Sequence, residues 1–300
     1  MQTFTLRWKN FELNLGRRTA IMGIVNVTPD SFSDGGRFYA TDAAVAQAER
    51  LVAEGADILD IGGESTRPFA QEVSAQEEIA RVLPVIQRLA GRIPVPISID
   101  TAKAVVADAA LSAGAAMVND IGALGLDADM GAVAARHRVP VIIMHMKGLP
   151  RTMQIDPVYA DLIQEVHQFL QAAMGRAQAA GIAREHIIID PGIGFGKTLA
   201  HNLLLIRQLQ RFADLKAPIL IGPSRKAFIR KILSADLGTE LKADRPEVET
   251  GTQAALALSI VNGAHIVRVH DVANTRAMVR VLDAIRTAES LHPMNSAVKN

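Results

Sequence analysis

The chain has 300 residues, of which 49% are hydrophobic but only 4% aromatic, so we expect a core made mainly of Ala, Val, Ile and Leu. A formal net charge of +1 argues against nucleic acid or an anionic membrane as the main partner. The lack of cysteine excludes disulfides, thiolate zinc sites and a cysteine nucleophile, and it fits the cytoplasmic location that we expect. We expect no secretory signal and no membrane span, because no segment has the necessary apolar run.

An apolar segment that ends in polar residues recurs along the chain. The first, residues 21–27, leads into TPDSFSDGG, a loop dense in turn formers that would be unremarkable if it stood alone. Seven further segments follow the same pattern, and most lead into an Ala-rich amphipathic stretch. In chain order they are residues 58–61, 95–99, 115–118, 139–144, 187–189, 218–221 and 264–269.

Eight strand–loop–helix units in 300 residues predict an α/β fold of the closed (β/α)8 type, a TIM barrel. A doubly wound sheet is the alternative, but such sheets have fewer strands and reverse their order. The residues before 21 are expected to form a short N-terminal hairpin at the bottom of the barrel. We expect a single domain over residues 1–300, with its core at about 18–288. Residues 234–249 are polar and charged, and could be a helical insertion or a mobile segment.

Polar side chains stand at the carboxyl ends of the predicted strands, which meet on one face of a barrel and bind ligands there. Any one of them could be a helix cap or a loop residue. Together they predict a polar ligand, because burying so many unpaired polar groups would be costly. The set comprises Asn26, Glu64, Thr66, Arg67, Asp100, Asn119, Asp120, His145, Asp190, Ser224, Arg225, Lys226, Arg268 and His270.

Part of this set suits phosphate and a divalent cation. Arg67, Arg268 and His270 are donors that could bind phosphate oxygens, the arginines in a bidentate manner. Asn26 could offer an oxygen to Mg2+, which keeps most of its waters and bridges to phosphate.

Another part suits a flat heterocycle. Asp100, Asn119 and Asp190 could accept the paired hydrogen bonds that an amino-pyrimidine edge donates. The segment GIGFGK, residues 192–197, is rich in glycine but lacks the spacing of a P-loop, so its glycines could simply let the backbone approach a ligand closely.

Seven motifs in this order carry a family resemblance: NVTPDSFSDGG, DIGGESTRP, SIDT, VND, DPGIGFGK, SRK and RVHDV. Over residues 21–271 the chain resembles the dihydropteroate synthases of the folate pathway. The resemblance implies a (β/α)8 barrel and a transferase. The implied reaction condenses 6-hydroxymethyl-7,8-dihydropterin diphosphate with 4-aminobenzoate, with Mg2+, and gives 7,8-dihydropteroate and diphosphate.

The family pattern also implies roles for single residues. Asn26 corresponds to the metal ligand, while Thr66, Arg268 and His270 contact the diphosphate. The residues that hold the pterin ring are Asp100, Asn119, Asp190 and Lys226.

The 4-aminobenzoate site, where sulfonamides compete in this family, is implied as well. Phe195 is expected to pack near both the pterin and the aminobenzoate. Ser224, Arg67, Pro68 and Phe32 are expected to help form the aminobenzoate site.

The implied mechanism is dissociative. Arg268 and His270 would take up the charge of the leaving diphosphate, and Asp100 would stabilise the pterin cation. With Lys226, these are the expected catalytic residues. The loops around residues 28–38 and 64–70 would exclude water and be poorly ordered without ligand.

Two positions depart from the family pattern, namely Phe69, where glycine is usual, and Lys147 in HMKG. Two other functions are alternatives on the same barrel: a corrinoid methyltransferase that uses methyltetrahydrofolate, and a non-catalytic pterin-binding protein. The first needs no diphosphate site, so Arg268 and His270 argue against it. Small-molecule substrates and a second copy of the chain, in a homodimer, are the partners that we expect.

Overall fold

The computed structural model describes residues 1–27, 36–65, 72–149 and 152–288, with residues 36–39 described by their backbone alone. Eight parallel strands form its main sheet, in the order β8-β7-β6-β5-β4-β3-β10-β9. These strands are β3 (Ala20–Asn26), β4 (Ile58–Gly62), β5 (Ile97–Asp100), β6 (Met117–Asp120), β7 (Val141–Met144), β8 (Ile187–Asp190), β9 (Leu220–Ile221) and β10 (Ile266–Val269). A parallel bridge between Ile189 and Ile219 joins the two edges, so the sheet closes into a barrel and the predicted (β/α)8 fold is confirmed.

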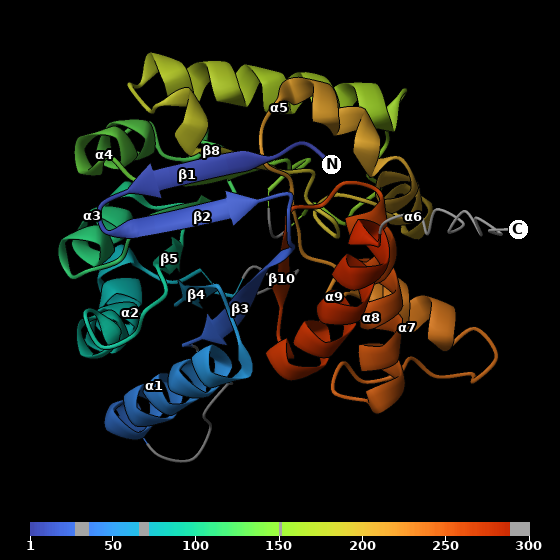
Figure 1. Ribbon diagram of the computed structural model, residues 1–300, viewed down its shortest axis with the longest axis horizontal. Coiled ribbons are helices and arrows are strands. Elements are labelled where there is room, and N and C mark those ends of the chain that lie inside the picture. Colours follow the sequence, from blue (N-terminus) through green and yellow to red (C-terminus); the bar gives the residue numbers. More distant parts are fainter. Residues whose placement is uncertain (28–35, 66–71, 150–151, 289–300) are drawn as a thin grey trace, which may run out of the picture.

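Helices surround the strands, as Figure 1 shows. They are α1 (Gly36–Glu54), α2 (Ala75–Leu89), α3 (Ala104–Ser112), α4 (Met130–His137), α5 (Leu162–Ala179), α6 (Leu199–Arg207), α7 (Ala227–Leu233), α8 (Pro246–Val261) and α9 (Val272–Thr287), with 3-10 turns η2 (Arg184–His186) and η3 (Leu209–Leu215). The polar segment after β9 separates α7 from α8, and α8 begins inside it at Pro246, a residue favoured in the first turn of a helix. None of the helices in the described part of the chain is long and apolar enough to cross a membrane.

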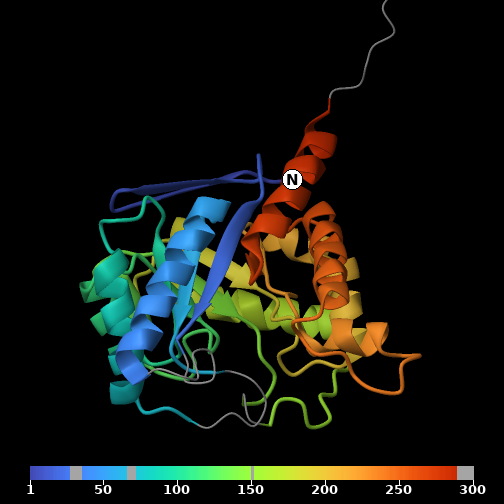
Figure 2. The same ribbon diagram turned by 90° about the horizontal axis from the view of Figure 1, so that it is seen from below.

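The predicted N-terminal hairpin is confirmed. Strands β1 (Phe4–Trp8) and β2 (Phe11–Leu15) pair antiparallel and lie across one end of the molecule (Figure 2). The indole of Trp8 is buried and donates a hydrogen bond to the carbonyl of Ala116, 2.7 Å away and just before β6. His265, just before β10, bonds to the carbonyl of Gln2 at 3.1 Å. Because both partners precede strands, the hairpin covers the amino-terminal ends of the barrel and leaves the carboxyl ends to the site.

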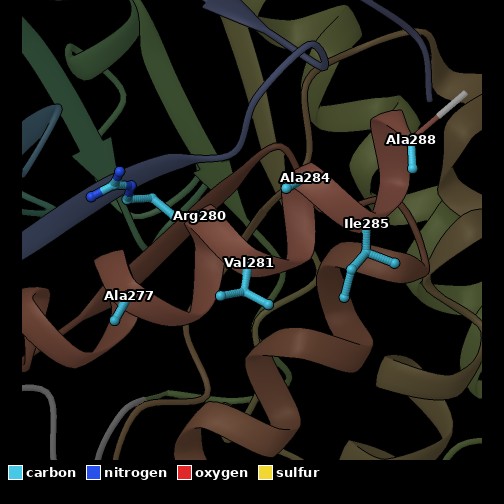
Figure 3. Close-up of a pocket in the computed structure, with 6 residues that line it drawn as sticks. All are labelled: Ala277, Arg280, Val281, Ala284, Ile285 and Ala288. Atoms are coloured by element: carbon cyan, nitrogen blue, oxygen red, sulfur yellow. The ribbon is translucent and has the colours of Figure 1, made fainter.

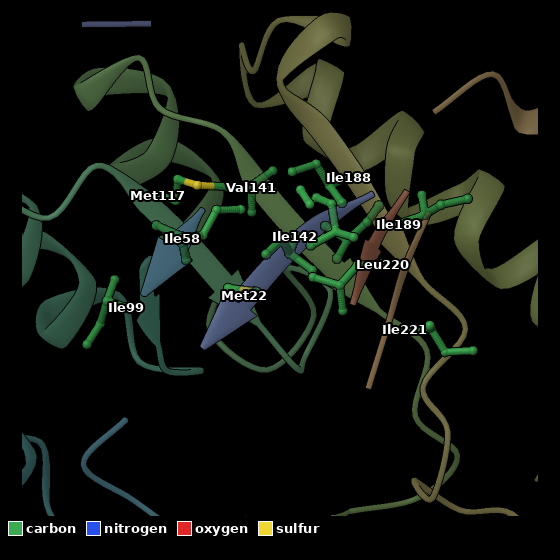
Figure 4. Packing of buried hydrophobic residues seen from close by; sticks show 14 of the residues in the cluster. Met22, Ile58, Ile99, Met117, Val141, Ile142, Ile188, Ile189, Leu220 and Ile221 are labelled. Carbon is green, nitrogen blue, oxygen red and sulfur yellow. The ribbon is translucent and has the colours of Figure 1, made fainter. Parts of the chain in front are cut away.

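The core is aliphatic, as the composition predicts. Met22 and Ile58 pair across β3 and β4, Ile142 and Ile188 pair across β7 and β8, and all four are fully buried within the barrel (Figure 4). Such strands are buried on both faces, so their sequences read as continuous apolar runs rather than as alternating ones. A charged residue inside one of these runs therefore needs a partner.

Candidate active site

Strand register brings the predicted pterin residues to one interior face. Asp100 at the end of β5 pairs in register with Asn119 of β6, and with Gly62 of β4 on its other side. Paired residues of neighbouring parallel strands point to the same face of a sheet. Asp60 lies two residues before Gly62 on β4, so it faces the interior one layer deeper than Asp100.

A network of ion pairs and hydrogen bonds joins four strands at this face. The Nε of Arg268 donates to Asp60 Oδ2 and its Nη2 donates to Asp100 Oδ2, both at 2.6 Å. Asn119 Nδ2 donates to the same oxygen of Asp60 at 2.9 Å. The network fixes the guanidinium and the amide before any ligand binds.

The network shifts the pKa values of its members in ways that matter for chemistry. Burial, together with the carboxylates of Asp60 and Glu78, raises the pKa of Asp100 to about 7, although Arg268 acts in the opposite direction. Burial acts to lower the pKa of Arg268, but Asp60 and Asp100 together hold it above its usual value, so the guanidinium stays charged. Asp100 is therefore an acid that titrates near neutral pH, which is a common property of groups in active sites.

A second acid–base pair lies beside the network. Asp190, at the end of β8, is buried, and burial raises the pKa of its carboxyl against the lowering effect of Lys226. One of its oxygens accepts a hydrogen bond from the amide of Gly192 at 2.7 Å. Burial lowers the pKa of Lys226 to about 8, and its Nζ lies 4.4 Å from the centre of the Phe195 ring. An acceptor, a donor and an aromatic face therefore adjoin one another, as recognition of a flat polar ring requires.

Ser224 and His270 are brought together after β9 and β10. Ser224 Oγ lies 2.9 Å from Nδ1 of His270, and the backbone amide of His270 donates to the same hydroxyl at 3.3 Å. Two contacts to one buried hydroxyl fix the orientation of the imidazole.

Asn26 suits a magnesium ion in part. It ends β3 beside Gly62, is half-buried, and its side chain has no hydrogen-bond partner among the described residues. Mg2+ uses few protein ligands and keeps several waters, so a single amide oxygen together with substrate oxygens fits its needs. In the described ranges, no group of three His, Cys, Asp or Glu side chains could hold a metal ion.

Several predicted site residues lie outside the described residues. Thr66, Arg67, Pro68 and Phe32 belong to residues 28–35 and 66–71, and so does Phe69. Their roles, and the predicted behaviour of the two loops, therefore stay predictions.

Sequence reasoning placed Asp120 in the polar cluster, and the structure corrects this. Neighbouring residues of a strand point to opposite faces, so Asp120 points away from the face of Asn119. Its carboxylate accepts the amides of Gly122 and Leu124, both at 2.7 Å, and stabilises the turn after β6. Burial raises the pKa of this carboxyl to about 6.

Conversely, Asp60 was missed. The available signal was a carboxylate inside the apolar run ILDIG, which a fully buried strand tolerates only with a partner. The departure at Lys147 has a local explanation. Its ammonium lies 4.1 Å from the centre of the Tyr159 ring and 3.1 Å from Glu165 of α5, so it attaches the loop after β7 to that helix.

Comparison with known proteins agrees with this geometry. A family model described as "Pterin binding enzyme" matches residues 22–270. A dihydropteroate synthase from Synechocystis sp. is 49% identical over 270 residues, which cover 90% of this chain and 91% of the relative. The chain belongs to the pterin-binding enzyme family, among the dihydropteroate synthases.

Two solved structures extend the comparison. A dihydropteroate synthase from Xanthomonas albilineans with 4-aminobenzoic acid has a TM-score of 0.84 and 44% identity, covering 93% of this chain and 96% of the other. The enzyme of the same organism in complex with 7,8-dihydropteroate has a TM-score of 0.80 and 42% identity, covering 92% and 97%. Family, fold and enzyme class are thus as the sequence predicted.

Proposed function

We propose that this chain condenses 6-hydroxymethyl-7,8-dihydropterin diphosphate with 4-aminobenzoate at the carboxyl ends of its strands. The observation that carries the proposal is the network in which Arg268 bonds to Asp60 and Asp100 at 2.6 Å. The network holds the Arg268 guanidinium beside the Asp100 carboxyl, whose pKa is about 7. The complexes of relatives with 4-aminobenzoic acid and with 7,8-dihydropteroate support the choice of substrates.

The pterin ring would bind between Asp190 and Lys226. The Asp190 carboxylate would accept two hydrogen bonds from the amino-pyrimidine edge, and the lysine would donate to a ring oxygen or nitrogen. Asn119, held by Asp60 at 2.9 Å, would bind a neighbouring edge of the same ring. We propose that Phe195 packs against the pterin and the aminobenzoate, with Ser224, Arg67, Pro68 and Phe32 completing the aminobenzoate site.

The diphosphate would bind to Arg268, His270 and Thr66. Two nitrogens of the guanidinium already bond to carboxylates, and Nη1 makes no hydrogen bond to a described residue. That nitrogen remains available for a phosphate oxygen. The ring of His270 is held in position by Ser224. Mg2+, held by Asn26 and the substrate, would supply positive charge against the leaving diphosphate.

The reaction would then need little proton transfer from the protein. As the carbon–oxygen bond breaks, diphosphate would leave with both bonding electrons, and the negative charge of Asp100 would stabilise the pterin cation. The amine of 4-aminobenzoate attacks the exocyclic carbon and loses its proton to solvent. Asp100, Lys226, Arg268 and His270 are therefore the proposed catalytic residues.

Turnover of the purified chain tests the proposal. We expect diphosphate release that depends on 4-aminobenzoate, stops with EDTA and returns with Mg2+. Methyl transfer from methyltetrahydrofolate to a corrinoid, without diphosphate release, would instead support the methyltransferase. Pterin binding with neither activity would support a non-catalytic barrel.

We also propose a homodimer, formed through α8 and α9. On α9, Val281 and Ile285 are 62% and 67% exposed, and they project from a groove that also includes Arg280 and three alanines (Figure 3). On α8, Leu258 and Val261 are 49% and 58% exposed. Exposed apolar residues on two helices that pack together support a second copy as the occupant, because closed symmetric dimers are the commonest assembly.

Light scattering of the double variant Val281→Glu, Ile285→Glu tests the dimer. We expect the double variant to be a monomer. Ile232→Glu on α7, at a residue that is 46% exposed, is the matched control and should leave the mass unchanged. An unchanged mass in the double variant would place the interface elsewhere. The cytoplasmic location stays a prediction.

A further inference from the structure

Side-chain hydrogen bonds hold the backbone of the glycine loop (residues 192–197) along most of its length. Four successive backbone carbonyls, those of residues 193–196, each accept a hydrogen bond from a different side chain. In chain order of the carbonyls, the donors are Lys226, Gln154, Lys197 and Tyr159. Glycine gives a backbone high conformational freedom, and these hydrogen bonds restrict the loop to one conformation.

Lys197 is the most deeply buried of these donors. The residue is 2% exposed, and its Nζ lies 2.9 Å from Nδ1 of His145 and 2.9 Å from the carbonyl oxygen of Phe195. The carbonyl of His145 is a third acceptor at 3.4 Å. No hydrogen bond joins this amine to a carboxylate within the described residues. Lys197 therefore connects the end of β7 to the backbone of Phe195, and does not present a charge to the substrate.

His145, to which Lys197 connects the loop, is itself held firmly by packing. The glycine loop packs so closely on the segment after β7 that a Cβ at Gly192 or Gly196 would collide with the carbonyls of His145 and Lys147. His145 packs edge-on against Phe169 of α5, with the ring centres 4.8 Å apart. A shift of His145 would therefore have to move the barrel wall as well.

We propose that Lys197 is a positioning residue, which holds the Phe195 ring in place for the substrates by joining the Phe195 carbonyl to His145. The inference rests on the proposed packing of Phe195 against the substrates. Nothing but the Lys197 side chain joins that carbonyl to β7 within the described residues. Losing the connection should leave the barrel intact and affect the site alone.

Steady-state kinetics of Lys197→Met, Phe195→Ala and the double variant test the inference. For Lys197→Met we expect kcat/KM for 4-aminobenzoate to fall about tenfold, the size expected from losing a hydrogen bond in a closed site. Most of the loss should appear in KM. If Lys197 acts through Phe195, the double variant is no worse than Phe195→Ala alone. Lys231→Met, the same change at an exposed lysine on α7, is the control and should behave as wild type.

Two further measurements separate positioning from folding. The single tryptophan, Trp8, lies in the hairpin at the opposite end of the barrel, so its fluorescence should be unchanged in every variant that folds. His145→Ala removes the acceptor without touching Lys197 and should reproduce the loss. His145→Asn can place an oxygen near the position of Nδ1 and should recover most of the activity.

The outcomes distinguish this inference from the proposed role of Phe195. Wild-type kinetics of Lys197→Met beside an impaired Phe195→Ala would overturn the inference alone. The inference alone would also be overturned if the losses in kcat/KM of the two single variants multiplied in the double variant. Wild-type kinetics of Phe195→Ala would overturn the role of Phe195 and this inference with it.

Discussion

Replacing Asp60 by asparagine should impair catalysis without unfolding the barrel. Oδ2 of Asp60 accepts from Arg268 at 2.6 Å and from Asn119 at 2.9 Å, and the carboxylate is fully buried. An amide keeps the shape and one acceptor oxygen but removes the charge. Charge-assisted hydrogen bonds contribute about 1.5 to 3 kcal/mol, so a loss of about 2 to 3 kcal/mol in transition-state stabilisation is expected. This corresponds to a fall of roughly 30- to 150-fold in kcat/KM.

The same substitution should shift the pH profile. The Asp60 carboxylate raises the pKa of Asp100, which is about 7. With Asp60 neutral, that repulsion disappears and Arg268 interacts with Asp100 alone, so the pKa of Asp100 must fall. If ionised Asp100 stabilises the pterin cation, the acid limb of kcat/KM lies near pH 7 in the wild type and moves to lower pH in Asp60→Asn.

Diphosphate release measured across the neutral pH range, with saturating 4-aminobenzoate, is the assay. Asp57→Asn is the matched control, because Asp57 also binds an arginine, Arg18 at 2.7 Å, but lies at the other end of β4. It should leave both kcat/KM and the acid limb unchanged. An Asp60→Asn enzyme with wild-type kcat/KM and an unmoved acid limb would refute the idea that the network prepares Arg268 and Asp100 for catalysis.

Three further predictions concern the ring, the diphosphate and the hairpin. Asp190→Asn should weaken binding of a pterin analogue by about 2 to 4 kcal/mol in calorimetry, since one acceptor becomes a donor; unchanged affinity would contradict this assignment. Arg268→Ala should weaken binding of the dihydropterin diphosphate far more than that of a pterin without diphosphate, and equal losses would place the guanidinium at the ring. Burial lowers the pKa of His265 from 6.5 to about 4. Below pH 6.5 the unfolded chain therefore binds a proton that the folded protein does not, and the free energy of unfolding falls by up to about 3 kcal/mol as the pH drops to 4. Urea unfolding of His265→Asn should show a smaller loss over that range, and an identical loss would exclude His265 as its source.

The barrel could be predicted from the sequence because its strands are buried on both faces. Such strands appear as short apolar runs, and each of the eight expected runs overlaps a strand of the barrel. Strand ends shifted by one or two residues, since hydrogen bonds rather than apolarity decide where a strand stops. The polar cluster at the carboxyl ends followed from the same pattern, and Asp100, Asn119 and Asp190 do end their strands there.

Pairing within the site could not be predicted in the same way. Asn119 and Asp120 are neighbours in the sequence, yet the alternation of side chains along β6 sends only the first into the site. Asp60 was missed because it stands inside an apolar run rather than at its end. The partners of Arg268 depend on the register between strands that lie far apart in the sequence, and composition does not encode that register.

The two ends of the barrel differ in their chemistry. At the bottom, Trp8 and His265 are neutral groups whose hydrogen bonds are made, so they stabilise the fold. At the mouth, one buried oxygen of Asp60 has no hydrogen-bond partner among the described residues, and burial raises the pKa of Asp100, so these charges are held at an energetic cost. Neutralising Asp60 should therefore lower activity far more than it lowers the free energy of unfolding, because Asp100 still pairs with Arg268, and truncating Trp8 should do the reverse. If both changes affected stability and activity alike, the barrel would not separate its folding end from its catalytic end.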